Sequence, residues 1–333
     1  MSNHVALVTG GAGFIGSELS RQLALQFDRV LIVDNLVNGR RENVEDVLGD
    51  RVELHVADIR NIERMTGLMQ GVDLVFHLAC LGVRHSIHSP RENHDVNATA
   101  TLDLLAVARS SGVRRFVYVS SSEVYGTAQW APMTEAHPTY PMTVYGSGKL
   151  AGECYTRAYH RTYGYPTVVV RPFNSYGPRC HHEGDSGEVI PKFLLRTLAG
   201  KPMVIFGDGT QTRDFTYVED TARGILLAGL ADEAVGETIN LGQGSEISIN
   251  ALAEEIARLL GRDQAEVIHE AERPGDVWRL FADSSKAGSL LGFRPTVSLG
   301  EGLARLLAWY RSGDRPAEEL LEQEVVCNWE SVG

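Results

Sequence analysis

The sequence predicts an α/β protein with a doubly wound parallel sheet and a smaller mixed α/β lobe. Short apolar runs of the kind that form buried parallel strands alternate with helical patterns through the first half of the chain. After about residue 173 this alternation breaks down into shorter, mixed elements. We therefore expect residues 1–173, with about 214–245, to form the sheet domain, and residues 174–213 and 246–333 to form an interleaved second lobe.

A glycine triplet follows the first predicted strand, Val5–Val8, and precedes a helical pattern over Ser17–Gln26. In the spacing Gly10, Gly13 and Gly16, the first glycine allows a tight turn and the second lets backbone N–H groups approach a pyrophosphate. The third lets the helix pack on the strand, and the helix N-terminus faces the phosphates with its positive end. Because the triplet lies between a strand and a helix, it predicts a Rossmann-type dinucleotide site.

The second predicted strand, Arg29–Val33, is followed by an acidic residue. Asp34 lies 18 residues after Gly16, about where an acid binds the hydroxyls of the adenosine ribose. A carboxylate at this position would repel a 2′-phosphate, so the sequence favours NAD over NADP. Arg40 and Arg41 leave some room for NADP.

The alternation of strands and helices continues to residue 170. Asp58 follows the third strand and is a candidate partner for the adenine amino group, and the segment His77–Ser86 should lie over the cofactor at the carboxyl end of the fourth strand. We interpret His77 as a structural residue. The other elements expected here are strands Val52–Val56, Asp73–Ala79, Arg115–Ser120 and Thr167–Val170, a helix Asn97–Arg109 with an apolar face of Ala98, Leu102, Leu105 and Ala106, and a helix from Tyr145 to about Tyr163.

The second half has a polar stretch, Cys180–Gly187, in which two adjacent histidines stand near two acids, Glu183 and Asp185. Adjacent side chains point in different directions and no third spaced ligand is present, so we interpret this stretch as a loop and expect no metal site. The elements expected after it are a helix Val189–Ala199, a strand Val204–Phe206, a strand Thr238–Gly242, an amphipathic helix Ile249–Leu260, and a mostly helical end, Leu299–Glu324, interrupted near Gly313.

The composition excludes several classes of protein. A formal net charge of −12 argues against a general nucleic-acid or membrane-surface binder. No apolar run reaches membrane-spanning length, and the N-terminus does not have the pattern of a signal peptide. The four cysteines show neither metal nor disulfide spacing, which fits a reducing cytoplasm.

A tyrosine and a lysine, Tyr145 and Lys149, have a spacing that indicates a possible site of proton transfer. Tyr145 and Lys149 are four residues apart, so they lie one turn apart on the same face of a helix. A nearby ammonium favours the phenolate and would lower the tyrosine pKa, which would let the tyrosine take a proton from a sugar hydroxyl near neutral pH. A serine at the end of the strand Arg115–Ser120 could hold or relay that proton.

Together these motifs resemble the extended short-chain dehydrogenase/reductase family, in its nucleotide-sugar epimerase and dehydratase branch. The resemblance covers Val5 to about Tyr310 and implies NAD as cofactor, a nucleotide-diphosphate sugar as substrate, two lobes and a homodimer. The motifs that carry it are Gly10–Gly16, His77–Ala79, Asn97, Ser120–Gly126, Tyr145 with Lys149, Arg171–Arg179, Gly207–Phe215 and Arg273–Asp276.

The resemblance also implies roles for single residues. Tyr145 would be the general base, Lys149 would bind the nicotinamide ribose, and Ser121 would bond the sugar O4, with Ser122 as the alternative. Asn174, Arg213 and Arg273 match positions that hold the diphosphate, where a structural salt bridge is the competing interpretation for each arginine. The remaining expected site residues are Glu123 beside the catalytic set, Phe14, Ile15, Asn35, Ile59, Leu78, Ala79 and Pro172 at the cofactor, and Arg84, Ser86 and Val189 at the substrate.

In this family the oxidised 4-keto sugar can be reduced on its other face, lose water or, as a uronate, lose carbon dioxide. Dehydratases place an Asp-Glu pair after the serine, whereas this chain has Ser122 and Glu123, which decarboxylases also show. The acidic stretch Glu183–Glu188 would repel a substrate carboxylate, so we predict a 4-epimerase of a neutral nucleotide sugar. The alternatives are a UDP-glucuronate decarboxylase or uronate 4-epimerase, for which Arg84 could supply the cation, and with less support a 4,6-dehydratase or a non-catalytic sensor of the cofactor or sugar-nucleotide pool.

Overall fold

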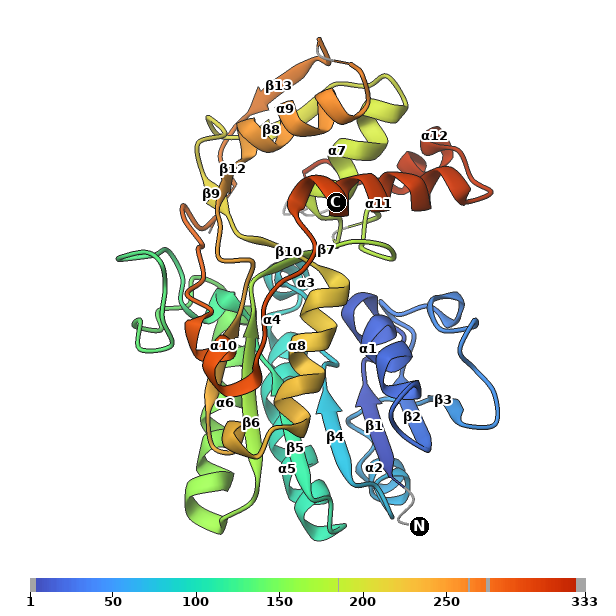
Figure 1. Ribbon diagram of the computed structural model, residues 1–333, viewed down its shortest axis with the longest axis vertical. Coiled ribbons are helices and arrows are strands. Elements are labelled where there is room, and N and C mark those ends of the chain that lie inside the picture. The colour runs from blue at the N-terminus through green and yellow to red at the C-terminus, as the bar shows by residue number, and fades with distance from the viewer. Residues whose placement is uncertain (1–3, 185, 263, 274–275, 328–333) are drawn as a thin grey trace.

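The computed structural model describes residues 4–184, 186–262, 264–273 and 276–327, and its larger lobe is built on one seven-stranded parallel sheet (Figure 1). The strand order is β11-β6-β5-β4-β1-β2-β3, so the direction of winding reverses between β1 and β4. This confirms the predicted doubly wound fold. The strands are β1 Val5–Thr9, β2 Arg29–Asp34, β3 Val52–Val56, β4 Leu74–His77, β5 Arg115–Val119, β6 Thr167–Pro172 and β11 Thr238–Leu241.

Helices cover both faces of this sheet. In β1, Ala6 and Val8 belong to the apolar cluster on one face, and Val5 and Leu7 to the cluster on the other. Burial on both faces explains why these strands read as continuous apolar runs instead of alternating patterns. The helices are α1 Phe14–Ala24, α8 Val218–Leu230 and α10 Ser285–Leu291 on the first face, and α2 Ile62–Leu68, α5 Ala100–Ser110 and α6 Val144–Tyr163 on the second.

The smaller lobe lies above the carboxyl ends of the strands in Figure 1 and has its own apolar core. A parallel pair, β8 Met203–Phe206 and β13 Val267–Glu270, packs with helices α7 Val189–Leu198, α9 Ile249–Leu259, α11 Leu299–Ser312 and α12 Ala317–Leu320. The remaining short elements are β7 Asn174–Tyr176, β9 Thr212–Arg213, β10 Phe215–Tyr217, β12 Ile247–Ser248, α3 Val83–His88 and α4 Pro90–His94.

The structure corrects the predicted helix Asn97–Arg109. The helical path begins at Pro90 and passes through a π-helical turn at Asp95–Thr99 before α5. Leu102 and Ala106, expected on the buried face, are exposed. The stripe that is buried consists of Thr101, Leu104, Leu105 and Ala108. Both stripes have helical spacing, so only the packing of α5 against α2 and α6 decides which one is covered.

Helix α10 departs from the predicted division of the chain. It lies within 246–333, which we expected to belong to the second lobe. Ala287, Leu291 and Phe293 instead join the core of the sheet, and α10 packs against β11 and α8. β11 is the edge strand of the sheet, and its Ile239 and Leu241 share this apolar core with the residues of α10.

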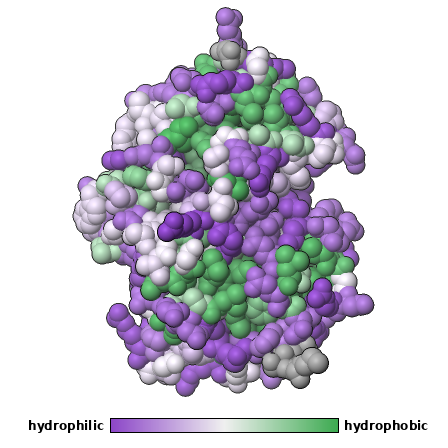
Figure 2. All heavy atoms as spheres, viewed as in Figure 1, coloured by the Kyte–Doolittle hydropathy of each residue, from purple (hydrophilic) through white to green (hydrophobic). Residues whose placement is uncertain are grey.

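The surface is hollowed between the two lobes, and hydrophilic residues surround the notch at the right of Figure 2. Among the helices in the described ranges, none combines the length and the apolar character that crossing a membrane requires.

Candidate active site

A cavity of about 630 Å³ lies between the lobes, at the carboxyl ends of the strands. The reversal of strand order between β1 and β4 opens such a crevice in doubly wound sheets. Of the residues that the sequence predicted for the site, all but Ser86 line this cavity. The chain therefore brings together residues as distant in sequence as Gly10 and Arg273.

Ser86 occupies a structural position instead of the substrate contact that we expected. It is buried in α3, and its hydroxyl donates to the carbonyl of Val83 at 2.6 Å. Its neighbour Arg84 does line the cavity. Successive residues of a helix point in different directions, and the sequence alone does not indicate which of them faces the site.

The glycine loop has the geometry that its spacing predicts. Gly10 has φ +68°, which favours glycine, and a Cβ on Gly16 would lie 2.1 Å from the carbonyl oxygen of Gly10. Gly13 caps α1 without a side-chain hydrogen bond, so α1 begins at Phe14, three residues before the predicted start. The first-turn N–H groups of this helix are available to an anion at the cavity.

Asp34 ends β2 beside the glycine loop. Its carboxylate accepts from the backbone N–H of Ala12 at 3.0 Å and of Leu36 at 2.9 Å. A carboxylate has about four acceptor sites, so Asp34 keeps acceptor capacity for a ribose hydroxyl. Burial raises the pKa of Asp34, partly offset by these N–H groups. The residues at this end of the cavity thus fit a dinucleotide.

Of the two arginines that left room for a 2′-phosphate, Arg40 and Arg41, the first is already paired. Arg40 Nη2 lies 2.6 Å from Glu183 Oε1, which joins the sheet domain to the substrate lobe. Two residues after β3, Asp58 accepts from Arg60 Nη2 at 2.6 Å and from Asn35 Nδ2 at 3.3 Å. The hydrogen bond from Arg60 lowers the pKa of Asp58 to about 2, so this carboxylate is charged.

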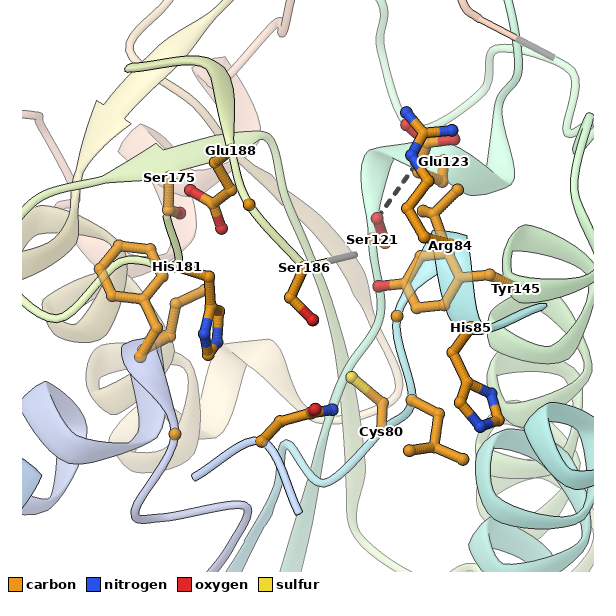
Figure 3. A pocket seen from close by; sticks show the side chains of 18 of the residues that line it. Cys80, Arg84, His85, Ser121, Glu123, Tyr145, Ser175, His181, Ser186 and Glu188 are labelled. Carbon is orange, nitrogen blue, oxygen red and sulfur yellow. Dashed lines mark hydrogen bonds between the residues drawn. The ribbon is translucent and has the colours of Figure 1, made fainter. Parts of the chain in front are cut away.

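Tyr145 and Ser121 face the cavity from one wall (Figure 3). Thr143 caps α6 through its side chain, which accepts from the N–H of Gly146 and starts the helix at Val144. Ser121 Oγ accepts from the N–H of Glu123 at 3.2 Å and thereby fixes the serine loop. Cys80 approaches Tyr145 from the exit of β4.

The structure does not show the lowered Tyr145 pKa that the sequence predicts from Lys149. Burial raises the pKa of Tyr145 well above its usual value, the neighbouring Cys80 adds to this, and hydrogen bonding to Ser121 opposes it. The Lys149 ammonium donates to the carbonyl of Val119 at 2.9 Å and lies 6.0 Å from the centre of the Tyr145 ring. Helical spacing places both residues on one face, but the strand carbonyl draws the ammonium away.

His77 is structural, as predicted. The ring is buried, and its two nitrogens bond the hydroxyls of Thr9 at 2.7 Å and Thr101 at 2.9 Å. Burial lowers its pKa to about 3, so the ring is neutral. His77 thus ties β1, β4 and α5 together beneath the site.

Three arginines, Arg84, Arg213 and Arg273, lie on the next part of the wall, and two of them share Asp276. Arg213 and Arg273 pair with Asp276 at 2.7 and 3.0 Å, so each has the salt bridge that was the competing interpretation. Burial and, to a lesser extent, the charge of Arg273 lower the pKa of Arg84 to about 10. Within the described ranges, no hydrogen bond or ion pair holds the Arg84 guanidinium. With Glu123 included, the cluster has three cations and two anions and keeps a positive excess for a diphosphate.

The opposite wall comes from the loop before α7 and includes His181, Ser186 and Glu188 (Figure 3). Burial raises the pKa of Glu188 to about 7, with His181 opposing the shift. Among the described residues, no three His, Cys, Asp or Glu side chains gather as metal ligands, while Asp185 lies outside those residues. Asn174, at the start of β7, places a buried side-chain oxygen at the cavity, and no partner for it lies in the described ranges.

A model of one protein family, described as GDP-mannose 4,6 dehydratase, matches residues 7–306. The chain belongs to this family. Its membership confirms the predicted place in the extended short-chain dehydrogenase/reductases, in the nucleotide-sugar epimerase and dehydratase branch.

Relatives within the family carry three different activities. A UDP-glucose 4-epimerase of Mycolicibacterium smegmatis is 37% identical over 92% of this chain and 98% of its own. A UDP-glucuronic acid decarboxylase of Xenopus tropicalis is 35% identical over 92% of this chain and 72% of its own. The crystal structure of a dTDP-glucose 4,6-dehydratase from Streptomyces venezuelae, with NAD bound, superposes with a TM-score of 0.87 at 36% identity, over 93% of this chain and 97% of that one. Overall similarity to the family therefore does not choose the reaction.

Several residues that line the cavity were not predicted from the sequence. Cys80 directly follows Ala79, which was predicted at the cofactor, so its neighbour in sequence could have indicated it. Asp276 is the last residue of the motif Arg273–Asp276 and could have been predicted from that motif. Lys192, Arg196 and Glu324 line the cavity without any motif around them. For these three the sequence has no signal, because their place depends on how the second lobe folds back over the sheet.

Proposed function

We propose that this protein is an NAD-dependent nucleotide-sugar 4-epimerase that works through a transient 4-keto sugar. The observation that carries the proposal is the position of Tyr145 and Ser121 between a dinucleotide site and an arginine cluster, in one cavity. A sugar whose diphosphate lies on the arginines then reaches the tyrosine, and the relative from M. smegmatis, a UDP-glucose 4-epimerase, supports this reading.

The chain's own residues bind the cofactor and move the proton. The glycine loop would hold the pyrophosphate of the cofactor, Asp34 would bind its adenosine ribose, and Lys149 would bond the nicotinamide ribose. NAD, when bound, accepts the C4 hydrogen of the sugar as hydride and returns it. Tyr145 takes the O4 proton during oxidation and gives it back during reduction, while Ser121 orients the O4 oxygen. Epimerisation requires the keto sugar to turn over in the cavity between these two steps.

The residues beside Tyr145 argue against dehydration. Loss of water needs an acid and a base, and the position of the dehydratase aspartate holds Ser122, which is buried and has no ionisable group in the working range. Glu123 remains, with a pKa that burial raises and that Arg213 and Arg84 lower. One carboxyl group next to arginines does not provide the required pair.

A uronate is the second candidate substrate, and the structure strengthens it. The negative charge of the acidic stretch Glu183–Glu188, which argued against a uronate, is partly compensated because Arg40 pairs with Glu183. Glu188 still lines the cavity and opposes a substrate carboxylate when ionised, although its pKa of about 7 leaves it partly protonated at neutral pH. Arg84, on the opposite wall near Glu123, has no partner among the described residues and could bind that carboxylate (Figure 3). The neutral sugar stays our first proposal.

The deciding experiment incubates the purified protein with UDP-, GDP- and dTDP-sugars, both neutral and uronate, and follows products by mass spectrometry and proton NMR. An unchanged mass with an altered H4 coupling supports the epimerase. Loss of carbon dioxide or water replaces it with a decarboxylase or a dehydratase. A protein that binds these compounds and converts none of them fits the sensor alternative.

The arginine cluster gives a separate prediction. Replacing Arg213 with glutamine should raise KM for the nucleotide sugar by about 10- to 100-fold, because a hydrogen bond to a charged group contributes about 1.5–3 kcal/mol. The effect on kcat should be smaller. Arg279→Gln is the matched control, because Arg279 pairs with Glu246 at the surface and does not line the cavity. If steady-state kinetics gave the same KM for the two variants, Arg213 would not be a binding residue for the nucleotide sugar.

We also propose that the protein is a homodimer through the exposed sides of α5 and α6. These helices pack together and leave Leu102 36% and Tyr163 52% exposed. Leu102→Glu should convert the dimer to a monomer in sedimentation, because two buried charges would face each other. Leu25→Glu is the control: Leu25 is 87% exposed at the end of α1, and its replacement should leave the mass unchanged. A wild-type monomer would contradict the proposal.

The cytoplasmic location stays a prediction.

A further inference from the structure

An ion pair joins two walls of the cavity at its cofactor end. Arg40 Nη2 donates to Glu183 Oε1 at 2.6 Å. Arg40 belongs to the loop after β2 in the sheet domain, and Glu183 to the loop before α7 in the second lobe. Neither residue lines the cavity, whereas Gly39 and His181 close to them do. The pair therefore lies at the edge of the cavity, where it connects the lobes without taking space from a ligand.

The backbone at Arg40 is fixed beside the residues that fit the cofactor. Its N–H donates to the carbonyl of Ala12, in the glycine loop, at 3.0 Å. A Cβ on the preceding Gly39 would lie 2.7 Å from both carboxylate oxygens of Asp34. The side chain of Arg40 thus starts next to the positions expected for the pyrophosphate and the adenosine ribose, and it reaches from there to the other lobe.

The loop that carries Glu183 is held in shape by its own hydrogen bonds. The N–H of Glu188 donates to the carbonyl of His181 at 2.8 Å, which closes the loop. The N–H of His182 donates to Glu183 Oε2 at 2.9 Å, while Oε1 faces Arg40. Burial by itself would raise the pKa of Glu183, but hydrogen bonds from His181 and His182 hold it well below its usual range. The carboxylate is therefore charged when it meets the guanidinium.

A dinucleotide at this end of the cavity would lie between the two loops. The glycine loop and Asp34 would hold it on the side of the sheet domain, and the loop of the second lobe presents Ser186 and Gly187 to the same cavity. Leaving past this edge requires the loops to separate, which breaks the ion pair. An epimerase returns the hydride to the same sugar, so its cofactor is not consumed and need not exchange between turnovers.

We propose that Arg40 and Glu183 form a latch between the lobes that slows the exchange of NAD. Both are positioning residues, because they act through the walls of the cavity and do not line it. Loss of the latch should therefore speed both the release and the entry of NAD, and Kd should change less than the release rate. Damage to the binding site itself would instead raise Kd as much as the release rate.

Exchange of labelled cofactor tests the latch without turnover. Protein loaded with adenine-labelled NAD is mixed with excess unlabelled NAD, and the label that stays bound is measured after rapid desalting. Equilibrium dialysis with the same labelled NAD gives Kd. Glu183→Gln and Arg40→Gln should each release NAD about three- to tenfold faster than wild type, because each removes a partly exposed, charged hydrogen bond. The double variant should be no faster than either single variant, because both substitutions break the same pair.

Glu219→Gln is the matched control. Glu219 in α8 pairs with Arg305 in α11 at 3.0 Å, so this partly exposed ion pair also joins the lobes, and neither residue lines the cavity. Its loss should leave the release rate within about twofold of wild type. Release from the control as fast as from Glu183→Gln would mean that any loosening of the lobes frees NAD, and it would overturn the latch.

Three further outcomes contradict the proposal: release at the wild-type rate in Glu183→Gln, effects of the two substitutions that multiply in the double variant, and a Kd that rises as much as the release rate. The result is independent of the reaction. A protein that forms no epimer but exchanges NAD faster without Glu183 keeps the latch and loses the epimerase. An active epimerase whose NAD exchange does not depend on Glu183 keeps the epimerase and loses the latch.

Discussion

Replacing Tyr145 with phenylalanine should lower kcat by about 10²- to 10⁴-fold, the usual contribution of a general acid–base group, while NAD stays bound. The ring keeps its packing in α6, and only the hydroxyl that exchanges the O4 proton is lost. Product formation is followed by proton NMR, and the cofactor content by absorbance after the protein is denatured. The two measurements separate a loss of proton transfer from a loss of the cofactor.

Tyr140→Phe is the matched control. Tyr140 is 72% exposed and does not line the cavity, so removing its hydroxyl should leave kcat within about twofold, because surface substitutions change little. Turnover of Tyr145→Phe near the wild-type rate would show that another group moves the proton.

Replacing Glu153 with glutamine should lower the free energy of unfolding by about 3–5 kcal/mol, the cost of leaving a buried charge without its partner. Glu153 and Arg171 are buried, and Arg171 Nε and Nη2 reach the two carboxylate oxygens at 2.8 and 2.6 Å. Ser120 donates to the same carboxylate at 2.6 Å, so the pair supports the strand that leads into Ser121. Urea denaturation measures the loss.

The stability that this pair contributes depends on pH. Burial by itself would raise the pKa of Glu153, but the hydrogen bonds and charge of Arg171 outweigh burial, and the pKa lies below its usual value. The contribution is therefore present above the unfolded-state pKa of about 4.3 and is lost as the pH falls through the lower, folded-state pKa. Glu153→Gln should lack this part of the acid dependence.

Glu255→Gln is the control for that experiment. Glu255 pairs with Arg258 at the surface of α9, where an ion pair contributes about 0–1 kcal/mol. If Glu153→Gln were no more destabilising than Glu255→Gln, the buried pair would have no net role in folding.

Local sequence signals predicted the cofactor end of the site well. The function of the glycine spacing depends only on a strand, a turn and a helix. Gly10 and Gly16 are six residues apart in the sequence and come into close contact in that turn. Asp34 follows from the length of the same unit. By contrast, Arg84 and Ser86 lie on different sides of the short helix α3. A helix of six residues is too short for its apolar pattern to predict which side faces the cavity.

By itself, then, the sequence determined the doubly wound sheet, the glycine loop with Asp34, and the spacing of Tyr145 and Lys149. The glycine loop, Asp34 and the Tyr145–Lys149 spacing are local features, in which strand and helix periods set which side chains meet, and the sheet follows from the repeated alternation of strands and helices. Only the tertiary structure decided that Lys149 bonds the carbonyl of Val119, that α5 buries Leu104 instead of Leu102, and that Glu324 reaches the cavity. These depend on which elements pack together and on how deeply they bury a charge, and burial is a property of the whole fold.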